Sequence, residues 1–156
     1  MGASGRRRAG RRRSYRPGNL TLETALDLLG RYHQAMLDKS ADDLADLYAE
    51  DALHEFPFTH GDGAVLRGRE AVRSRYTAVW GRMPFELVAV ENLITHAMID
   101  PDMLVAEQDI RVRDTATGAV FVASFVLVMT VRGGQIVRLR DYTDDLTFAR
   151  ATGRAR

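Results

Sequence analysis

The chain has 156 residues, of which 46% are hydrophobic, and this is enough for one domain with a single ordinary core. It contains no cysteine, no apolar run of about 18 residues, and no apolar segment after the arginines at 6–13. We therefore expect no disulfide, no thiolate metal site, no membrane span and no secretory signal, and we predict a cytoplasmic location.

The net charge of +1 hides an uneven distribution. Seven of the 22 basic residues lie within residues 1–18, where almost nothing is apolar, so we predict a disordered basic arm there. Such a run can bind phosphates or act as a nuclear-import address, but a plain solvated tail is the more common case. The remaining chain is net acidic, so we expect no nucleic-acid partner. We predict that residues 19–148 form the domain and 149–156 a C-terminal tail.

Helical periodicity comes first along the domain and strand patterns follow. Apolar stripes predict three helices, at about 20–36, 41–49 and 69–80. Alternating or β-branched runs predict strands at 52–58, 85–99, 104–114, 119–131 and 135–143. Turn residues near 100–102, 117–118 and 133–134 join the last four strands as antiparallel neighbours. This order predicts an α+β fold, with three helices packed on one face of a curved antiparallel sheet.

Strand parity separates the polar residues of the strand at 104–114. Glu107, Asp109, Arg111 and Arg113 share one face, which four charges mark as a solvated or subunit-contact surface. Gln108 is the polar residue on the opposite, apolar face. We therefore expect Gln108, and not the carboxylates beside it, to face the helices.

The last strand places a carboxylate on its less charged face. Asp141 shares parity with Val137, Leu139 and Thr143, while Ile136, Arg138, Arg140 and Tyr142 share the other side. A carboxyl beside an apolar wall is a usable general acid or base. The alternative is a structural ion pair with an arginine such as Arg69 or Arg140.

The strand at 119–131 is apolar on both parities, which is typical of a strand covered on both faces. Helices cover one face of the predicted sheet. We therefore expect a second copy of the chain to cover the other face, in a homodimer.

Two segments carry a family resemblance: Tyr48-Ala-Glu-Asp-Ala-Leu-His-Glu-Phe-Pro-Phe58, and the run 66–76, which starts a helix. Together they resemble the front half of the NTF2-like superfamily, which includes ketosteroid isomerase, SnoaL-type polyketide cyclases and limonene epoxide hydrolase. The resemblance covers residues 20 to about 146. It implies a cone-shaped α+β cup whose chemistry depends on the side chains that line it.

The catalytic residues of these three relatives match the residues of this chain only in part. Tyr32 matches the oxyanion-hole tyrosine of ketosteroid isomerase, but Phe56 and Leu127 stand where its two aspartates are expected, which argues against its mechanism. Asp141 matches the acid–base aspartate of the SnoaL-type cyclases, whose partner histidine falls near Leu127. Limonene epoxide hydrolase shares Asp141, but Gln108, Ile110, Leu53 and Glu55 replace its other groups.

The resulting hypothesis is a SnoaL-like enzyme for cofactor-free, acid–base cyclisation, isomerisation or epoxide opening of a hydrophobic small molecule. Asp141 would move the proton, Tyr32 would donate to a developing oxyanion, and Glu55 or His54 would supply a second proton-transfer group. The predicted substrate contacts are Gln108, Trp80, Phe56, Leu127 and Tyr76. The histidine spacing predicts no metal site. The alternative is a non-catalytic binding or regulatory module that uses the same cup.

Overall fold

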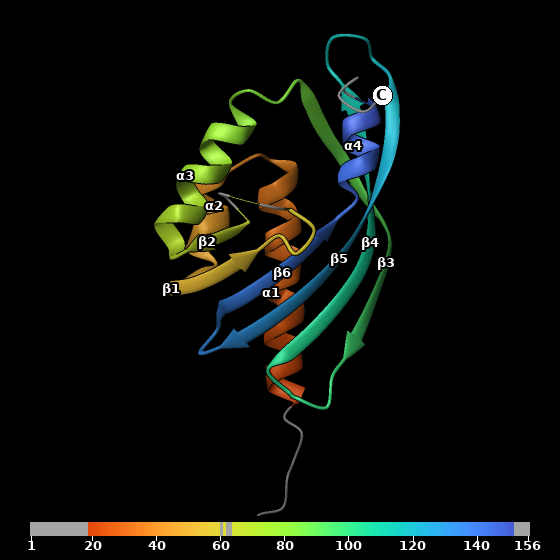
Figure 1. The fold of residues 1–156 in the computed structure, drawn as a ribbon. Helices are drawn as coiled ribbons and strands as arrows, with labels where there is room; N and C mark the ends of the chain where they lie inside the picture. Colours follow the sequence, from red (N-terminus) through yellow and green to blue (C-terminus); the bar gives the residue numbers. More distant parts are fainter. Residues whose placement is uncertain (1–18, 60, 62–63, 152–156) are drawn as a thin grey trace, which may run out of the picture.

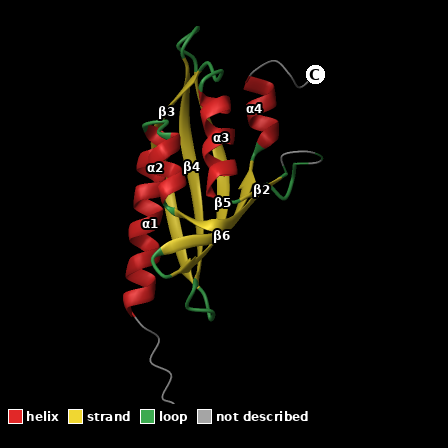
Figure 2. Cartoon of the chain, turned by 90° about the vertical axis from the view of Figure 1, so that its left-hand side faces the viewer, coloured by secondary structure: helices red, strands yellow, loops and turns green. Residues whose placement is uncertain are grey.

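The computed structural model describes residues 19–59, 61 and 64–151, so the predicted arm at 1–18 lies outside the described residues. Helices α1 (Asn19–Leu37), α2 (Ala41–Asp46) and α3 (Arg69–Trp80) lie on the same side of a six-stranded sheet (Figures 1 and 2). The strands are β1 (Tyr48–Glu55), β2 (Val65–Arg67), β3 (Phe85–Ala97), β4 (Met103–Asp114), β5 (Val120–Arg132) and β6 (Gln135–Thr143). A last helix, α4 (Asp145–Ala151), follows the sheet. The α+β architecture with helices on a curved sheet is confirmed.

The sheet is mixed, which corrects the prediction of a purely antiparallel one. Its order is β2-β1-β6-β5-β4-β3, and all neighbours are antiparallel except β1 and β6, which run parallel. The chain between β1 and β6 contains β2, α3 and the strands β3 to β5, and it is long enough to make the crossover that a parallel pair requires. This pairing brings the first and last strands of the chain side by side, which positions the candidate site.

Two boundaries near β1 differ from the sequence prediction. The second helix ends at Asp46 rather than Ala49, because Tyr48 pairs with Ile136 and the Ile136 amide donates to the Leu47 carbonyl. The first strand therefore begins at Tyr48, and it ends at Glu55, two residues before Pro57. Long-range pairing with β6 thus overrides the local helical preference of this segment.

The short strand β2 and the helix α4 are not indicated by periodicity, because each is too short to show a period. Gly68 joins β2 to α3 with φ of 88°, and an added Cβ would lie 3.1 Å from the Glu50 carbonyl oxygen. Asp144 starts α4 by accepting from the Thr147 amide at 3.0 Å. This helix continues beyond residue 148, where the sequence prediction ends the domain.

The buried side chains form two clusters. The larger lies between α1, α2, α3 and the inner face of the sheet, and includes Leu28, Leu44, Leu127 and Leu139. The smaller contains Phe85, Leu87, Ile110 and Val112, with Phe148 of α4 packed against it. Both lie on the helix side of the sheet.

One residue of β6 faces opposite to its predicted side. Ile136 is fully buried, although simple alternation from Arg138 and Arg140 places it on the outer face. The register between β5 and β6 shifts between Thr130 and Val131, so that Val131 and Ile136 become partners. Such an irregularity changes which side chains share a face. Beyond it, Leu139 and Asp141 point inward as alternation predicts.

Candidate functional site

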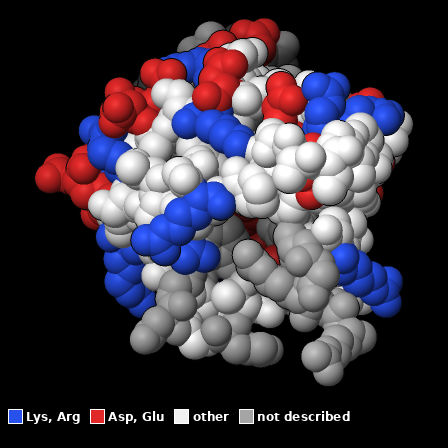
Figure 3. Space-filling model, turned by 90° about the horizontal axis from the view of Figure 1, so that it is seen from above, with Lys and Arg blue, Asp and Glu red and all other residues white. Residues whose placement is uncertain are grey.

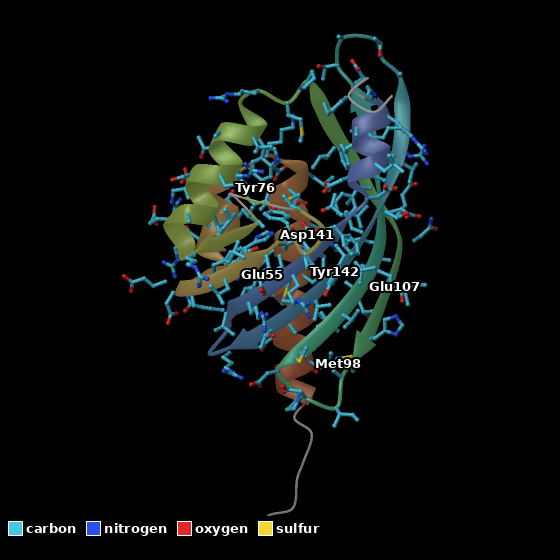
Figure 4. All side chains as sticks on the ribbon, in the orientation of Figure 1. Glu55, Tyr76, Met98, Glu107, Asp141 and Tyr142 are labelled. Atoms are coloured by element: carbon cyan, nitrogen blue, oxygen red, sulfur yellow. The ribbon has the colours of Figure 1, made fainter. Side chains whose placement is uncertain are left out.

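Asp141 and His54 face each other across the paired strands β6 and β1, on the helix side of the sheet. His54 lies opposite Leu139 and is fully buried, and Asp141 is 4% exposed. Their closest polar atoms, His54 Nε2 and Asp141 Oδ2, are 3.9 Å apart, which is longer than a direct hydrogen bond. Figure 4 shows Asp141 in the centre of the molecule, between the sheet and the α3 residue Tyr76. The two side chains form the centre of the candidate site.

The Asp141 carboxyl is held by its neighbour on the same strand face. Thr143 Oγ1 donates a hydrogen bond of 2.7 Å to Asp141 Oδ1. Burial raises the pKa of Asp141 to about 7, the Thr143 hydrogen bond opposes this shift, and the charge of Asp145 adds to it. Asp141 is therefore ready to gain or lose a proton near neutral pH.

Burial acts on His54 in the opposite direction. It lowers the pKa of His54 to about 3, so the imidazole is neutral at ordinary pH. Nδ1 lies 2.9 Å from the Tyr48 hydroxyl, and the rings of Phe56 and Tyr76 lie 4.6 Å and 5.7 Å from the His54 ring. Within the part of the chain that the structure describes, Nε2 has no hydrogen-bond partner. A buried polar atom of this kind is costly and points to a missing partner.

Tyr32 of α1 and Tyr76 of α3 lie close to Asp141. Burial raises the pKa of both phenols, and the negative charge of Asp141 raises them further. The hydrogen bond between the two hydroxyls raises the pKa of Tyr32 and opposes the rise at Tyr76. Tyr76 also packs on Trp80, with ring centroids 4.8 Å apart.

The structure selects His54 over Glu55 as the β1 residue that faces inward. Glu55 points to the outer face and pairs with Arg138, whose Nε lies 2.5 Å and whose Nη2 lies 3.1 Å from the two carboxylate oxygens. This hydrogen bonding is the main reason that the pKa of Glu55 lies below its usual value. Glu55 therefore does not share a site with Asp141 in this arrangement.

The predicted structural ion pair of Asp141 is also absent among the described residues. Arg69 instead donates to the backbone carbonyl of Tyr48, at 2.8 Å. The Arg140 guanidinium lies over the Tyr142 ring, 5.3 Å from its centroid. Asp141 is thus a buried carboxyl that faces an imidazole and phenols.

The predicted substrate contacts divide into two groups. Phe56 and Tyr76 pack against the His54 ring, and Trp80 packs against Tyr76. Gln108 Oε1 accepts a hydrogen bond of 2.6 Å from His33 Nε2. Gln108 pairs across the sheet with Phe125, which pairs with Thr143, so it is not in the row of Asp141. Leu127 pairs with Asp141 and is core, at 1% exposed.

Two contributing residues were not predicted from the sequence, Tyr48 and Thr143. Tyr48 falls in a segment with a helical pattern, and only its pairing with β6 shows that it shares a face with His54. Thr143 carries a usable signal, since it lies two residues after Asp141 on the same strand and therefore on the same face.

A largely open depression of about 730 Å³ lies at the end of β6, on the side of the sheet that carries Val126, Val128 and Tyr142. Its wall is mostly apolar and includes Phe58, Phe125, Val128, Tyr142 and Leu146, together with Thr143, which also binds Asp141. Seen from above, the molecule has a central hollow with acidic atoms in its depth (Figure 3). Among the described residues no group of three or more His, Cys, Asp or Glu is placed to hold a metal ion, and no helix is long and apolar enough to cross a membrane.

Known proteins with similar structures share this fold. A Bacillus subtilis protein, a proposed isomerase, superposes with a TM-score of 0.77 at 26% identity, covering 86% of this chain and 96% of its own. A phenazine biosynthesis-related protein from Pseudomonas aeruginosa gives 0.68 at 16% identity, covering 94% and 91%. A proposed polyketide cyclase from Xanthomonas campestris gives 0.66 at 20% identity, covering 82% and 96%. The last two are similar in fold alone.

The sequence comparison agrees with the structural one. YesE of Bacillus subtilis, an uncharacterized protein, is 26% identical over 132 residues, which are 84% of this chain and 88% of YesE. The SnoaL-like domain family matches residues 29–139, a span that includes Tyr32, Tyr48, His54 and Tyr76 and ends two residues before Asp141. This chain therefore belongs to the SnoaL-like domain family, within the NTF2-like superfamily.

Proposed function

We propose that this protein is a SnoaL-like enzyme that catalyses cofactor-free proton transfer on a hydrophobic small molecule, leading to isomerisation, cyclisation or epoxide opening. The observation that carries the proposal is the buried Asp141, whose pKa is raised to about 7, 3.9 Å from an unpaired imidazole nitrogen. Perturbed titratable groups that face one another in a buried site are typical of acid–base catalysis.

In this proposal the ionised Asp141 removes a proton from carbon next to a carbonyl group. The C–H bond breaks, the proton passes to the carboxylate, and the electron pair moves into an enolate. One hydroxyl of the hydrogen-bonded pair Tyr32 and Tyr76 donates a hydrogen bond to the enolate oxygen. The protonated Asp141 then returns the proton to the same or another atom of the substrate. This sequence needs no cofactor.

The proposed substrate is hydrophobic and uncharged because of the residues around the centre. Phe56, Tyr76 and Trp80 supply aromatic surface. None of the ion pairs among the described residues brings an arginine or lysine to Asp141. A carboxylate or phosphate on the substrate would therefore have no cation to neutralise it at this centre.

The decisive experiment is hydrogen–deuterium exchange at carbon, followed by NMR in D₂O, with hydrophobic ketones such as 2-tetralone as probes. The wild-type protein should accelerate exchange, and Asp141→Asn should slow it at least about a hundredfold, because the base is lost. Glu55→Gln is the matched control and should change the rate less than about twofold. Equal exchange by wild-type and Asp141→Asn protein would remove Asp141 from the chemistry.

A second candidate function, ligand binding without chemistry, is favoured by the open apolar depression of about 730 Å³ at the end of β6. The residues that wall it include Phe58, Val128 and Leu146 but neither His54 nor Asp141. An apolar cavity with few polar groups can hold a hydrophobic ligand without reacting with it. Probe ketones that bind with the same affinity to wild-type and Asp141→Asn protein, and that exchange in neither, would establish this function instead.

The outer face of the sheet suggests a second copy of the chain as partner. Val120 and Val122 are 49% and 42% exposed there, and Val126 and Val128 continue the same row in half-buried positions. We propose a homodimer through this row, since an exposed apolar patch on a sheet is normally covered. Sedimentation should give a dimer at micromolar concentration, and Val122→Arg should give a monomer. A wild-type monomer would contradict the proposal.

The cytoplasmic location stays a prediction.

A further inference from the structure

Tyr48 holds the side of the His54 ring that faces away from Asp141. Its hydroxyl lies 2.9 Å from His54 Nδ1, and the two rings are stacked with centroids 5.8 Å apart. Tyr48 is fully buried, and its backbone is fixed by pairing with Ile136 and by the hydrogen bond from Arg69 to its carbonyl. The hydroxyl therefore has little freedom to move away from Nδ1.

The proton count of this pair allows two arrangements. A neutral imidazole carries one hydrogen, so one of its nitrogens donates and the other accepts. Either Tyr48 donates to a bare Nδ1, with the hydrogen on Nε2, or Nδ1 donates to the Tyr48 oxygen and Nε2 is bare. The second arrangement leaves the buried Tyr48 hydrogen in need of another acceptor, and hydrogen-bond partners other than His54 are not found for this hydroxyl among the described residues.

The groups around the centre favour the first arrangement as well. Burial raises the pKa of Tyr48 well above its usual value, so its hydroxyl keeps its hydrogen, and His54 is neutral. Nε2 faces Asp141 Oδ2, and a bare nitrogen would set two lone pairs against each other when Asp141 is ionised. The other titratable groups near Asp141 are Tyr32 and Tyr76, which add no positive charge, and Asp145, which adds a negative one.

We propose that Tyr48 is a positioning residue that fixes His54 in the tautomer with hydrogen on Nε2, so that His54 serves as a neutral hydrogen-bond donor beside Asp141. This inference rests on the proposed function and refines it. His54 then does not act as the second base. A substrate that binds alongside this pair accepts a hydrogen bond from Nε2 at its oxygen while Asp141 takes the proton from the neighbouring carbon. Orientation of a catalytic imidazole by a hydrogen bond to its far nitrogen is a general device.

The tautomer can be measured without any substrate, by NMR of protein labelled with ¹⁵N in its histidines, between pH 6 and 9. We expect the His54 signals of a proton-bearing Nε2 and a bare, hydrogen-bonded Nδ1. Tyr48→Phe should reduce the Nε2–H fraction and raise the pKa of Asp141, because a bare Nε2 no longer stabilises the carboxylate. Tyr142→Phe, which removes a hydroxyl from the outer face, should change neither. A proton on Nδ1 in the wild-type protein, or a Tyr48→Phe spectrum identical to wild type, would overturn the proposal.

A second variant covers the case in which Tyr48→Phe does not fold. In Asp141→Asn the carboxylate is replaced by an amide that can donate or accept, so Tyr48 alone sets the tautomer. We expect the hydrogen to remain on Nε2 in this variant, and its transfer to Nδ1 would overturn the role of Tyr48.

The exchange assay separates this proposal from the proposed function. Tyr48→Phe should lower kcat about tenfold, the equivalent of one neutral hydrogen bond, with KM nearly unchanged. Absence of exchange in the wild-type protein would end the proposed function while the NMR result still decides the tautomer.

Discussion

The two faces of the β1–β6 pair shift the pKa of a carboxylate in opposite directions. On the outer face, Glu55 accepts two hydrogen bonds from Arg138, and its pKa is lowered. On the inner face, Asp141 receives one hydrogen bond from Thr143, and burial raises its pKa to about 7. The comparison shows that side-chain direction, a matter of one residue along a strand, decides whether a carboxylate is a surface ion-pair partner or a proton-transfer group.

The largest expected effect is on the pH dependence of stability at the inner face. His54 has a folded pKa of about 3, below its unfolded value, so its contribution increases as pH rises towards 6.5. Asp141 has a folded pKa of about 7, above its unfolded value, so its contribution is present at low pH and is lost as pH rises to 7. Between about pH 4 and 6.5 the two slopes have opposite signs and nearly cancel.

Single substitutions should separate these slopes in urea unfolding at pH 4 and 6.5. In Asp141→Asn the decrease of stability that Asp141 causes with rising pH is removed. Between pH 4 and 6.5 the free energy of unfolding of this variant should therefore rise by about 3–4 kcal/mol more than that of the wild type. His54→Gln should change in the opposite direction by a similar amount. Glu55→Gln is the outer-face control. Equal pH dependence in all four proteins would show that neither inner group has a strongly shifted pKa.

An intermediate effect is expected when the hydrogen bond that limits the rise of the Asp141 pKa is removed. Thr143→Val removes a donor to the carboxylate, so the pKa of Asp141 should rise further. The base is active when ionised, so the low-pH limb of the exchange rate should move to higher pH, with a few-fold loss at pH 7 and little loss at pH 9. Thr130→Val on β5 is the matched control. A limb that moves to lower pH would contradict this role of Thr143.

The smallest effect is expected on the outer face. Arg138→Gln removes the partner of Glu55, and the pKa of Glu55 should return towards its usual value. Both groups are partly exposed, so the free energy of unfolding should change by about 1 kcal/mol or less. Thermal unfolding measures this, and exchange activity should be unaffected. A large loss of activity would mean that the two faces are coupled.

Parts of the fold follow from local pattern because the signal is periodic. The helix at 69–80 and the strand at 135–143 agree with α3 and β6 at both ends. By contrast, the end of α2, the start of β1 and the position of Ile136 depend on pairing between strands that are distant in the sequence. Local preferences cannot report such pairing, since its energy comes from the partner strand.

The sequence by itself determined that Asp141 lies on the apolar face of the last strand and that His54 and Glu55 point to opposite sides of theirs. Only the tertiary structure decided that His54 is the inward residue, that it stands 3.9 Å from Asp141, and that Tyr48 holds its far nitrogen. The physical reason is that parity orders side chains relative to one another within a strand. Which face is buried is set by the parallel docking of β1 on β6 and by the helices that cover them.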